Sequence, residues 1–252
     1  MERKILKNKP LVEAIFETRW KLQEPVPGIK VDPHYKILLG RIYDRVKDEY
    51  PFHEQLPTAA MLDEFAGYVV QHRFRRNNNE WPLIQIGPGI ITLNDTKNYT
   101  WEDFEKRICS VVNILFDAYP DAENNLEVNW LSLRYIDTVD FNNKEGDVFS
   151  FLKNLKINIE VYEKLFEGNE VSNSPLGFDL RLAFSANEPK GAVHLRFVKD
   201  AEALKWETQV QSANVDVPAG KEQIIHWGTK AHELTDDWFF KMIDGELLRR
   251  FE

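Results

Sequence analysis

The order of the predicted strands and helices constrains this chain more than any single motif does. Eight segments alternate apolar with polar residues or are rich in β-branched residues, which is typical of strands with one covered face. Four other segments repeat apolar residues every three or four positions, as amphipathic helices do. Along the chain these segments give strand, helix, three strands and helix, and the same order then occurs a second time.

Corresponding elements of the two series lie about 110 to 120 residues apart. In the first series, strands are predicted at 11–20, 68–74, 82–86 and 90–93, and helices at 37–46 and 104–115. In the second series, strands are predicted at 126–141, 178–184, 193–197 and 204–210, and helical segments at 148–152, with a possible second stretch at 162–166, and at 224–248. Because the two halves share negligible sequence identity, the element order alone predicts two β-α-β-β-β-α repeats, residues 1–122 and 123–252, in one compact unit.

This element order favours an α+β fold, in which the strands form an antiparallel sheet and the helices pack on one face. It resembles the saddle of TATA-binding-protein-like domains and also resembles helix-grip domains. One set of apolar side chains is predicted to form the helix-covered face. They are Val12, Phe16, Leu133, Leu180, Leu195 and Trp206. The opposite face is then left to solvent or to a ligand.

Two local signals bound the helix predicted at 104–115. Thr100 precedes Asp103 by three residues, which resembles a capping box and predicts the N-terminus of the helix. Pro120 indicates that the helix has ended before that position.

The charge of the chain argues against nucleic-acid binding. There are 41 acidic and 32 basic side chains, which gives a net charge of −9. Residues 1–122 carry 17 basic and 18 acidic groups, whereas residues 123–252 carry 15 and 23. A saddle that binds duplex nucleic acid should be basic in both halves. We therefore expect no duplex nucleic acid as a partner, and anionic membranes are disfavoured for the same reason.

Cysteine usage and the N-terminal sequence favour a cytoplasmic protein. The one cysteine, Cys109, has no second cysteine with which to form an internal disulfide. The first residues lead into no long apolar run that resembles a signal peptide or a membrane span.

No motif predicts catalytic residues, a cofactor or a metal. The chain has no G-x-S-x-G elbow, no G-x-G-x-x-G and no C-x-x-C pair. His232 and Asp236 lie one helical turn apart but lack the second histidine of H-E-x-x-H, and His226 falls on another face of the helix. We expect these side chains to form a solvated helix surface. An enzyme stays possible but is less favoured than a binding protein.

The candidate binding residues lie on the uncovered face of the second half. They are Arg134, Arg181, His194, Arg196 and Glu207, with Asp179 and Lys205 among them and Arg73 of the first half as a possible neighbour. Arginines on successive strands could converge on a carboxylate or phosphate of a ligand or partner. The alternative, which we favour, is that Asp179 and Glu207 form cross-strand ion pairs with these arginines on a wet sheet face.

Two functional hypotheses follow. The first is a non-enzymatic binding or interaction protein, since no compact catalytic constellation is evident. The second is a small anionic or apolar ligand, or a substrate, held in a pocket between a curved sheet and the C-terminal helix. Trp227 and Trp238 would line that pocket, Arg134 or Arg196 would reach an anionic group, and its volume would be about 300 to 1,000 Å³.

Self-association is also expected, as a twofold dimer. Phe239, Ile243 and Leu247 lie off the main apolar stripe of the C-terminal helix. Either a second subunit or the segment 142–175 of the same chain should cover them.

Three segments carry a resemblance to a known family. They are Asn8 to Glu17 (NKPLVEAIFE), Gln85 to Gly89 (QIGPG) followed by Thr92-Leu93-Asn94, and Leu133 to Asp137 (LRYID). Together they resemble a sporadically distributed, uncharacterised family of prokaryotic proteins of about 250 residues, and the match spans essentially the whole chain. The resemblance implies a prokaryotic cytoplasmic protein and supplies no reaction or catalytic residues. Patchy occurrence is compatible with a role in defence or toxin neutralisation.

Overall fold

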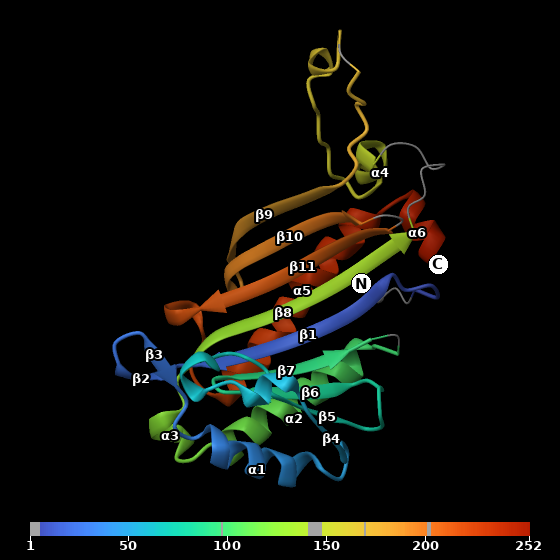
Figure 1. The fold of residues 1–252 in the computed structure, drawn as a ribbon. Coiled ribbons are helices and arrows are strands. Elements are labelled where there is room, and N and C mark those ends of the chain that lie inside the picture. Colours follow the sequence, from blue (N-terminus) through green and yellow to red (C-terminus); the bar gives the residue numbers. More distant parts are fainter. Residues whose placement is uncertain (1–5, 97, 141–147, 169, 201–202) are drawn as a thin grey trace.

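Nine antiparallel strands form one sheet in the order β4-β5-β6-β7-β1-β8-β11-β10-β9. The computed structural model, shown in Figure 1, describes residues 6–96, 98–140, 148–168, 170–200 and 203–252. The strands of the large sheet are β1 (Leu11–Trp20), β4 (Phe52–Gln55), β5 (His72–Arg75), β6 (Leu83–Gly87), β7 (Ile90–Asp95), β8 (Val128–Asp140), β9 (Phe178–Asn187), β10 (Lys190–Asp200) and β11 (Ala203–Ala213). A separate hairpin is made by β2 (Gln23–Val26) and β3 (Ile29–Val31).

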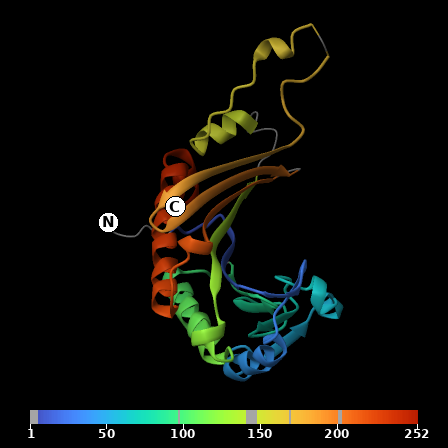
Figure 2. The same cartoon turned by 90° about the vertical axis from the view of Figure 1, so that its left-hand side faces the viewer.

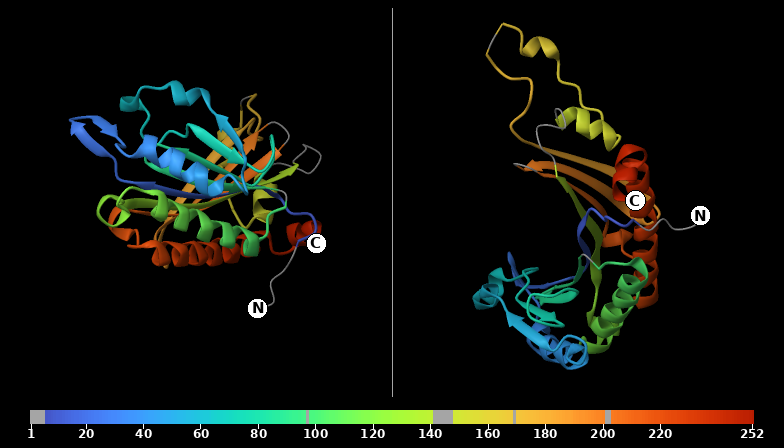
Figure 3. Two further views of the ribbon diagram at one scale, coloured as in Figure 1. Left: turned by 90° about the horizontal axis from the view of Figure 1, so that it is seen from below. Right: turned by 90° about the vertical axis from the view of Figure 1, so that its right-hand side faces the viewer.

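The helices cover one face of this sheet, so the expected α+β class is confirmed. They are α1 (Tyr35–Val46), α2 (Trp101–Ala118), α3 (Ala122–Asn125), α4 (Val148–Asn154), α5 (Lys221–Ile243) and α6 (Glu246–Phe251). Helices α2 and α5 contact each other beneath the sheet (Figure 3, left), and α1 contacts α2. Figure 2 shows the sheet curving, with α2 and α5 on its outer side.

The spacing of apolar residues along the sequence explains why the helices pack on one face of the sheet. Phe16 of β1 lies opposite Leu133 of β8 at the centre of the sheet, and both are buried. Thr100 caps α2 by accepting a hydrogen bond from the Asp103 amide at 3.4 Å, and α2 ends at Ala118, before Pro120. Both boundaries agree with the sequence signals.

Two predicted members of the core face are less buried than expected. Phe16, Leu133, Leu195 and Trp206 are buried, but Val12 is 42 % exposed. The register of β1 against β8 shifts between Leu11 and Glu13, and this irregularity takes Val12 out of the alternation. Leu180 is only half-buried because β9 is the last strand of the sheet.

The sequence predicts helical structure in two places between residues 148 and 166, at 148–152 and around 162–166, and the structure has a short helical element at each. Only α4 and a short 3₁₀ turn at Glu163–Leu165 are helical there. Between α4 and β9 the chain projects from the body of the protein (Figures 1 and 2). Several apolar side chains of this projecting segment are exposed. They are Val161, Tyr162, Leu165, Val171 and Leu176.

Two of the three apolar side chains that motivated the predicted dimer are covered within the chain, and the third, Phe239, is partly buried. Ile243 and Leu247 are 0 % and 2 % exposed. They share a core cluster with Phe151 and Leu152 of α4, which lie in the segment that was the intramolecular alternative. The dimer stays a prediction, without this support.

The glycines of the QIGPG segment have a structural role in the turn between β6 and β7. Gly89 has a φ of +77°, which favours glycine. A Cβ atom at Gly87 would collide with the backbone of Val69. Any side chain larger than hydrogen would therefore displace the chain that enters β5.

The two edges of the sheet differ in length. One edge strand, β4, has four residues, and the other, β9, has ten.

Among the residues that the structure describes, no helix has both the length and the hydrophobicity needed to cross a membrane.

Candidate functional site

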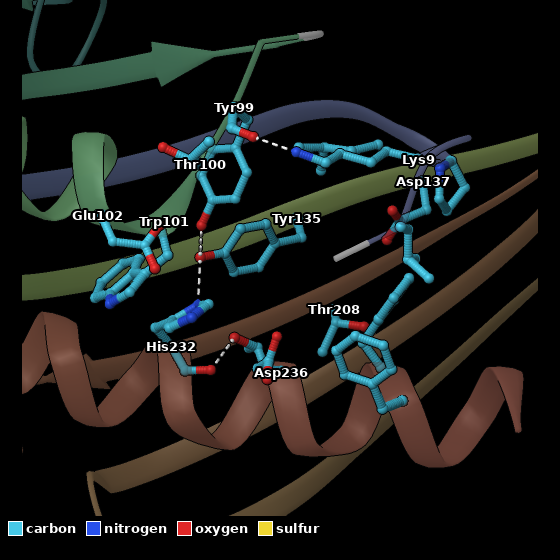
Figure 4. Close-up of a pocket in the computed structure, with 16 residues that line it drawn as sticks. Lys9, Tyr99, Thr100, Trp101, Glu102, Tyr135, Asp137, Thr208, His232 and Asp236 are labelled. Carbon is cyan, nitrogen blue, oxygen red and sulfur yellow. Dashed lines mark hydrogen bonds between the residues drawn. The ribbon is translucent and has the colours of Figure 1, made fainter. Parts of the chain in front are cut away.

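A pocket of about 170 Å³ lies between the sheet and the C-terminal half of α5 (Figure 4). The segment that leads into β1, the N-terminus of α2 and strands β8 and β11 complete its lining. Most of its wall is apolar. Leu6, Pro10, Leu11, Trp101, Phe239 and Phe240 contribute to this part of the lining.

Asp137 is the most unusual residue of the pocket. It follows Leu133 and Tyr135 at alternate positions of β8, so it lies on the helix-covered face and is only 3 % exposed. Burial raises the pKa of its carboxyl to about 8, so the group is mainly neutral at pH 7. No side chain or backbone group of the described residues donates a hydrogen bond to it.

Thr208 of β11 is a second buried polar residue in the same lining. It lies opposite Tyr135 in the sheet and is therefore a diagonal neighbour of Asp137, which is two residues further along β8. Thr208 is 2 % exposed. Its hydroxyl oxygen is buried and has no hydrogen-bond partner among the described residues. The pocket therefore has two buried polar side chains, Asp137 and Thr208, at diagonal positions of neighbouring strands.

A chain of hydrogen bonds forms another part of the pocket. The Tyr99 and Tyr135 hydroxyls are 2.8 Å apart, and the Tyr135 hydroxyl is 3.0 Å from Nδ1 of His232. The imidazole of His232 stacks on Trp101 with ring centroids 3.8 Å apart. His232 is thus buried, and the expected solvated helix surface is wrong at this position, because α2 packs its N-terminal turn against α5 there.

The charged groups around the pocket include one basic side chain and two further acids. Lys9 donates from its ammonium group to the Tyr99 carbonyl oxygen at 2.7 Å. Glu102 of α2 and Asp236 of α5 also contribute to the lining. Within the described part of the chain, no group of three histidine, cysteine or acidic side chains is arranged to hold a metal ion.

Chemically, this arrangement can bind a polar group and can move a proton. A neutral carboxyl offers one donor and one acceptor, and the Thr208 hydroxyl offers the same. The hydrogen-bonded Tyr99, Tyr135 and His232 side chains form a path along which a proton can pass.

The basic residues predicted from the sequence come together on the opposite face of the sheet. Arg196 donates to Asp179 at 2.9 and 3.0 Å and to Glu207 at 3.3 Å. Arg181 also donates to Asp179, at 2.9 and 3.2 Å, and Arg134 lies 3.7 Å from Glu207. The ion pairing of the favoured alternative is therefore present, and the two guanidinium groups, Arg196 foremost, hold the pKa of Asp179 well below its usual range.

Arg181, Arg196 and Glu207 also border a pocket of about 210 Å³, which includes His194 and Gln209. Nε2 of His194 is buried without a hydrogen-bond partner among the described residues. A binding role for this cluster stays a prediction. Arg73 is not a neighbour of it, because Arg73 bonds Gln85 on β6 and is separated from β8 by three strands.

The pocket on the helix-covered face differs from the one expected from sequence. Trp227 packs against Phe16 and donates to Ser212, and Trp238 packs edge-on against Phe184. Arg134 and Arg196 cannot reach the pocket, since they alternate with core residues and lie on the other face of the sheet.

A signal for Asp137 was available in the sequence. Leu131, Leu133 and Tyr135 alternate on one face of a predicted strand, and Asp137 continues that face. An acid at a core-facing position is unusual and often has a functional reason. Thr208 and Lys9 gave no comparable signal, because the tertiary fold alone brings them to the pocket.

Comparison with known proteins adds no assignment to this geometry. No family model matches the chain, and no curated protein matches it. The site is therefore interpreted from its own residues.

Proposed function

We propose that this protein binds a small, largely apolar molecule in the pocket between the sheet and α5, with Asp137 and Thr208 holding its polar end. The observation that carries the proposal is the buried Thr208 hydroxyl, which has no hydrogen-bond partner among the described residues, together with the desolvated Asp137 carboxyl in the same lining. Each unsatisfied buried group costs about 1–3 kcal/mol. A ligand that supplies the missing hydrogen bonds recovers this free energy on binding.

The size and lining of the pocket support a small ligand. A volume of about 170 Å³ is below the range of about 300–1,000 Å³ that is typical of drug-sized ligands. The aromatic rings of Trp101, Phe239 and Phe240 suit an apolar body. The ligand of this proposal has one polar group and a body about the size of one ring.

Two of the three segments that carry the family resemblance supply residues to this pocket. Lys9, Pro10 and Leu11 belong to the first, and Tyr135 and Asp137 to the last. This supports the pocket as the functional centre of a sporadically distributed prokaryotic family. We extend the proposal to a cytoplasmic location, with a role in defence or toxin neutralisation as its wider context.

The strand order supports the interpretation of two repeats in a saddle. Strands β7, β6 and β5 follow β1 on one side, and β11, β10 and β9 follow β8 on the other. A long helix with a pocket between it and the curved sheet is the feature that helix-grip domains use for ligands. The acidic charge of residues 123–252 opposes the duplex-binding role of a TATA-binding-protein-like saddle.

The proposal is tested by screening small molecules against the protein labelled with ¹⁵N. Binding in the pocket should shift the indole signal of Trp101, whereas that of Trp81, which lies on Arg75, should stay unchanged. The variant Thr208→Leu fills the pocket and removes the hydroxyl, so it should abolish these shifts. Gln211→Leu, on the opposite face of β11, is the matched control and should bind as the wild type does.

A library of several hundred fragments that leaves the Trp101 signal unchanged would rule out the proposal. Ligands that bind Thr208→Leu as well as the wild type would place the site elsewhere.

A protein partner is the second candidate, favoured by the exposed apolar side chains of the projecting segment. Tyr162 and Leu165 are both 63 % exposed, and a group of exposed large apolar side chains is typical of a surface that binds another protein. A protein captured from a native host by the wild type but lost with Tyr162→Asp and Leu165→Asp together would support this function. Equal capture by both proteins would contradict it.

A further inference from the structure

We propose that the polar end of the ligand is an ammonium group, whose nitrogen donates hydrogen bonds to the Asp137 carboxylate and the Thr208 hydroxyl. The inference rests on the proposed function and adds the chemical class of the ligand. It starts from the positions of the two side chains, which are diagonal neighbours on β8 and β11 and both line the pocket.

An ammonium group fits the acceptors that the pocket presents. An ionised carboxylate and a hydroxyl oxygen both accept hydrogen bonds, and an ammonium group has three donors. A ligand carboxylate would instead place two acids together, and each would oppose the ionisation of the other. A neutral ligand would leave the carboxyl protonated at pH 7, so it would gain no charge-assisted hydrogen bond from Asp137.

Lys9 does not supply that counter-charge. Its ammonium group donates to the Tyr99 carbonyl oxygen at 2.7 Å, and Figure 4 shows it directed towards Tyr99 and away from the Asp137 carboxyl. No salt bridge joins Asp137 to a basic side chain of the described residues. No basic side chain of the described residues therefore competes with a ligand's ammonium group for this acid.

The aromatic lining supports the same class of ligand. The rings of Trp101, Tyr135 and Phe240 contribute to the wall, and aromatic faces attract cations most strongly where water is excluded. The other charged or titratable groups that face the pocket are Lys9, Tyr99, Glu102, His232 and Asp236. Glu102, His232 and Asp236 have interactions of their own, and the inference does not depend on them.

Binding of an ammonium group has a measurable consequence for protons. In the empty pocket the pKa of Asp137 is about 8, so about 0.9 proton is released at pH 7 when the carboxyl ionises to pair with the ligand. The same linkage predicts an affinity that rises about 50-fold between pH 6 and pH 8 and levels off above that range. A carboxylate ligand would show the opposite trend.

The experiment is calorimetric titration of the full chain with three matched probes: 2-phenylethylamine, 2-phenylethanol and phenylacetate. We expect the amine to bind at least ten times more tightly than the other two at pH 8. At pH 7 its heat should differ between phosphate and Tris buffers by an amount that corresponds to about 0.9 released proton. Asp137→Asn should weaken the amine at least tenfold and leave the alcohol unchanged.

The control variant is Asp237→Asn. Asp237 pairs with Lys241 at 2.6 Å on the exposed side of α5, so this change should leave all three affinities unchanged. If the alcohol or phenylacetate binds in the pocket as tightly as the amine does, the ammonium inference is wrong and the proposed function stands. If none of the probes binds at 5 mM, the inference is also overturned, and the ¹⁵N screen decides separately whether the pocket binds small molecules.

Discussion

Asp137 lies directly across from Trp206 in the pairing of β8 with β11, and both residues are buried on the helix-covered face of the sheet. A carboxyl beside a fully buried indole has little access to water. This environment explains why desolvation raises the pKa of Asp137. The acid therefore costs stability whenever it is ionised.

The first prediction concerns the pH dependence of folding. The pKa of Asp137 is about 8 in the folded chain and about 3.9 in the unfolded chain, so the folded state binds more protons between these values. The contribution of this carboxyl to the stability of the wild type should therefore fall as the pH rises from 4 to 8. Asp137→Asn removes this loss, and its stability relative to the wild type should rise by roughly 2–4 kcal/mol between pH 5 and pH 8 in urea unfolding.

Asp237→Asn serves as the control for this series, since Asp237 is exposed. A difference between wild type and Asp137→Asn that is independent of pH would show that the carboxyl is not held neutral.

The second prediction concerns the hydrogen-bonded chain of Tyr99, Tyr135 and His232. Tyr135→Phe removes the central hydroxyl and should cost about 1–2 kcal/mol of unfolding free energy, whereas Tyr99→Phe should cost about half as much. The two changes share one hydrogen bond, so the double variant should cost less than the sum of the two. If the losses of unfolding free energy in urea for the two single variants add up to that of the double variant, the two hydroxyl groups are not coupled.

The third prediction separates packing from association at the end of α5. Ile243 is fully buried in the cluster with α4, so Ile243→Asp should destabilise the chain by more than about 3 kcal/mol. Thermal unfolding measures this loss. If light scattering instead shows a wild-type dimer that Ile243→Asp converts into a folded monomer, the residue lies at a subunit interface.

The fourth prediction is weak or absent binding to duplex DNA. A net charge of −9 opposes the release of counterions that dominates such binding. Fluorescence anisotropy with a labelled 20-base-pair duplex should detect no binding below about 10 µM protein at 150 mM salt. Submicromolar binding under these conditions would refute the expectation.

The sequence predicted the long elements well because their periods are unambiguous. The alternation in β1, β8 and β9 and the apolar stripes of α2 and α5 each extend over ten residues or more. Strands β2, β3 and β4 have only three or four residues, too few for a period to be recognised. The two short helical stretches predicted between 148 and 166 are present as α4 and one 3₁₀ turn.

The candidate site could be predicted only in part. The alternation along a strand shows which face of the sheet a side chain lies on, but it does not show how far that side chain is from residues of other elements. The ion pairs among Arg196, Asp179 and Glu207 follow from strand alternation, and the structure contains them. The pocket depends on how the N-terminus of α2 meets α5, which no local pattern encodes. His232 illustrates this point, because its sequence context is polar while Trp101 covers it in the fold.

The unequal edges of the sheet limit how this protein can assemble through its backbone. Strand β9 presents ten residues to a neighbouring strand, whereas β4 presents four. If two copies joined through β9, the new sheet would end in a short strand at both sides, and a third copy would find little to pair with. Strand addition would therefore stop at a closed pair. The short edge strand β4 would prevent the growth of open-ended fibres.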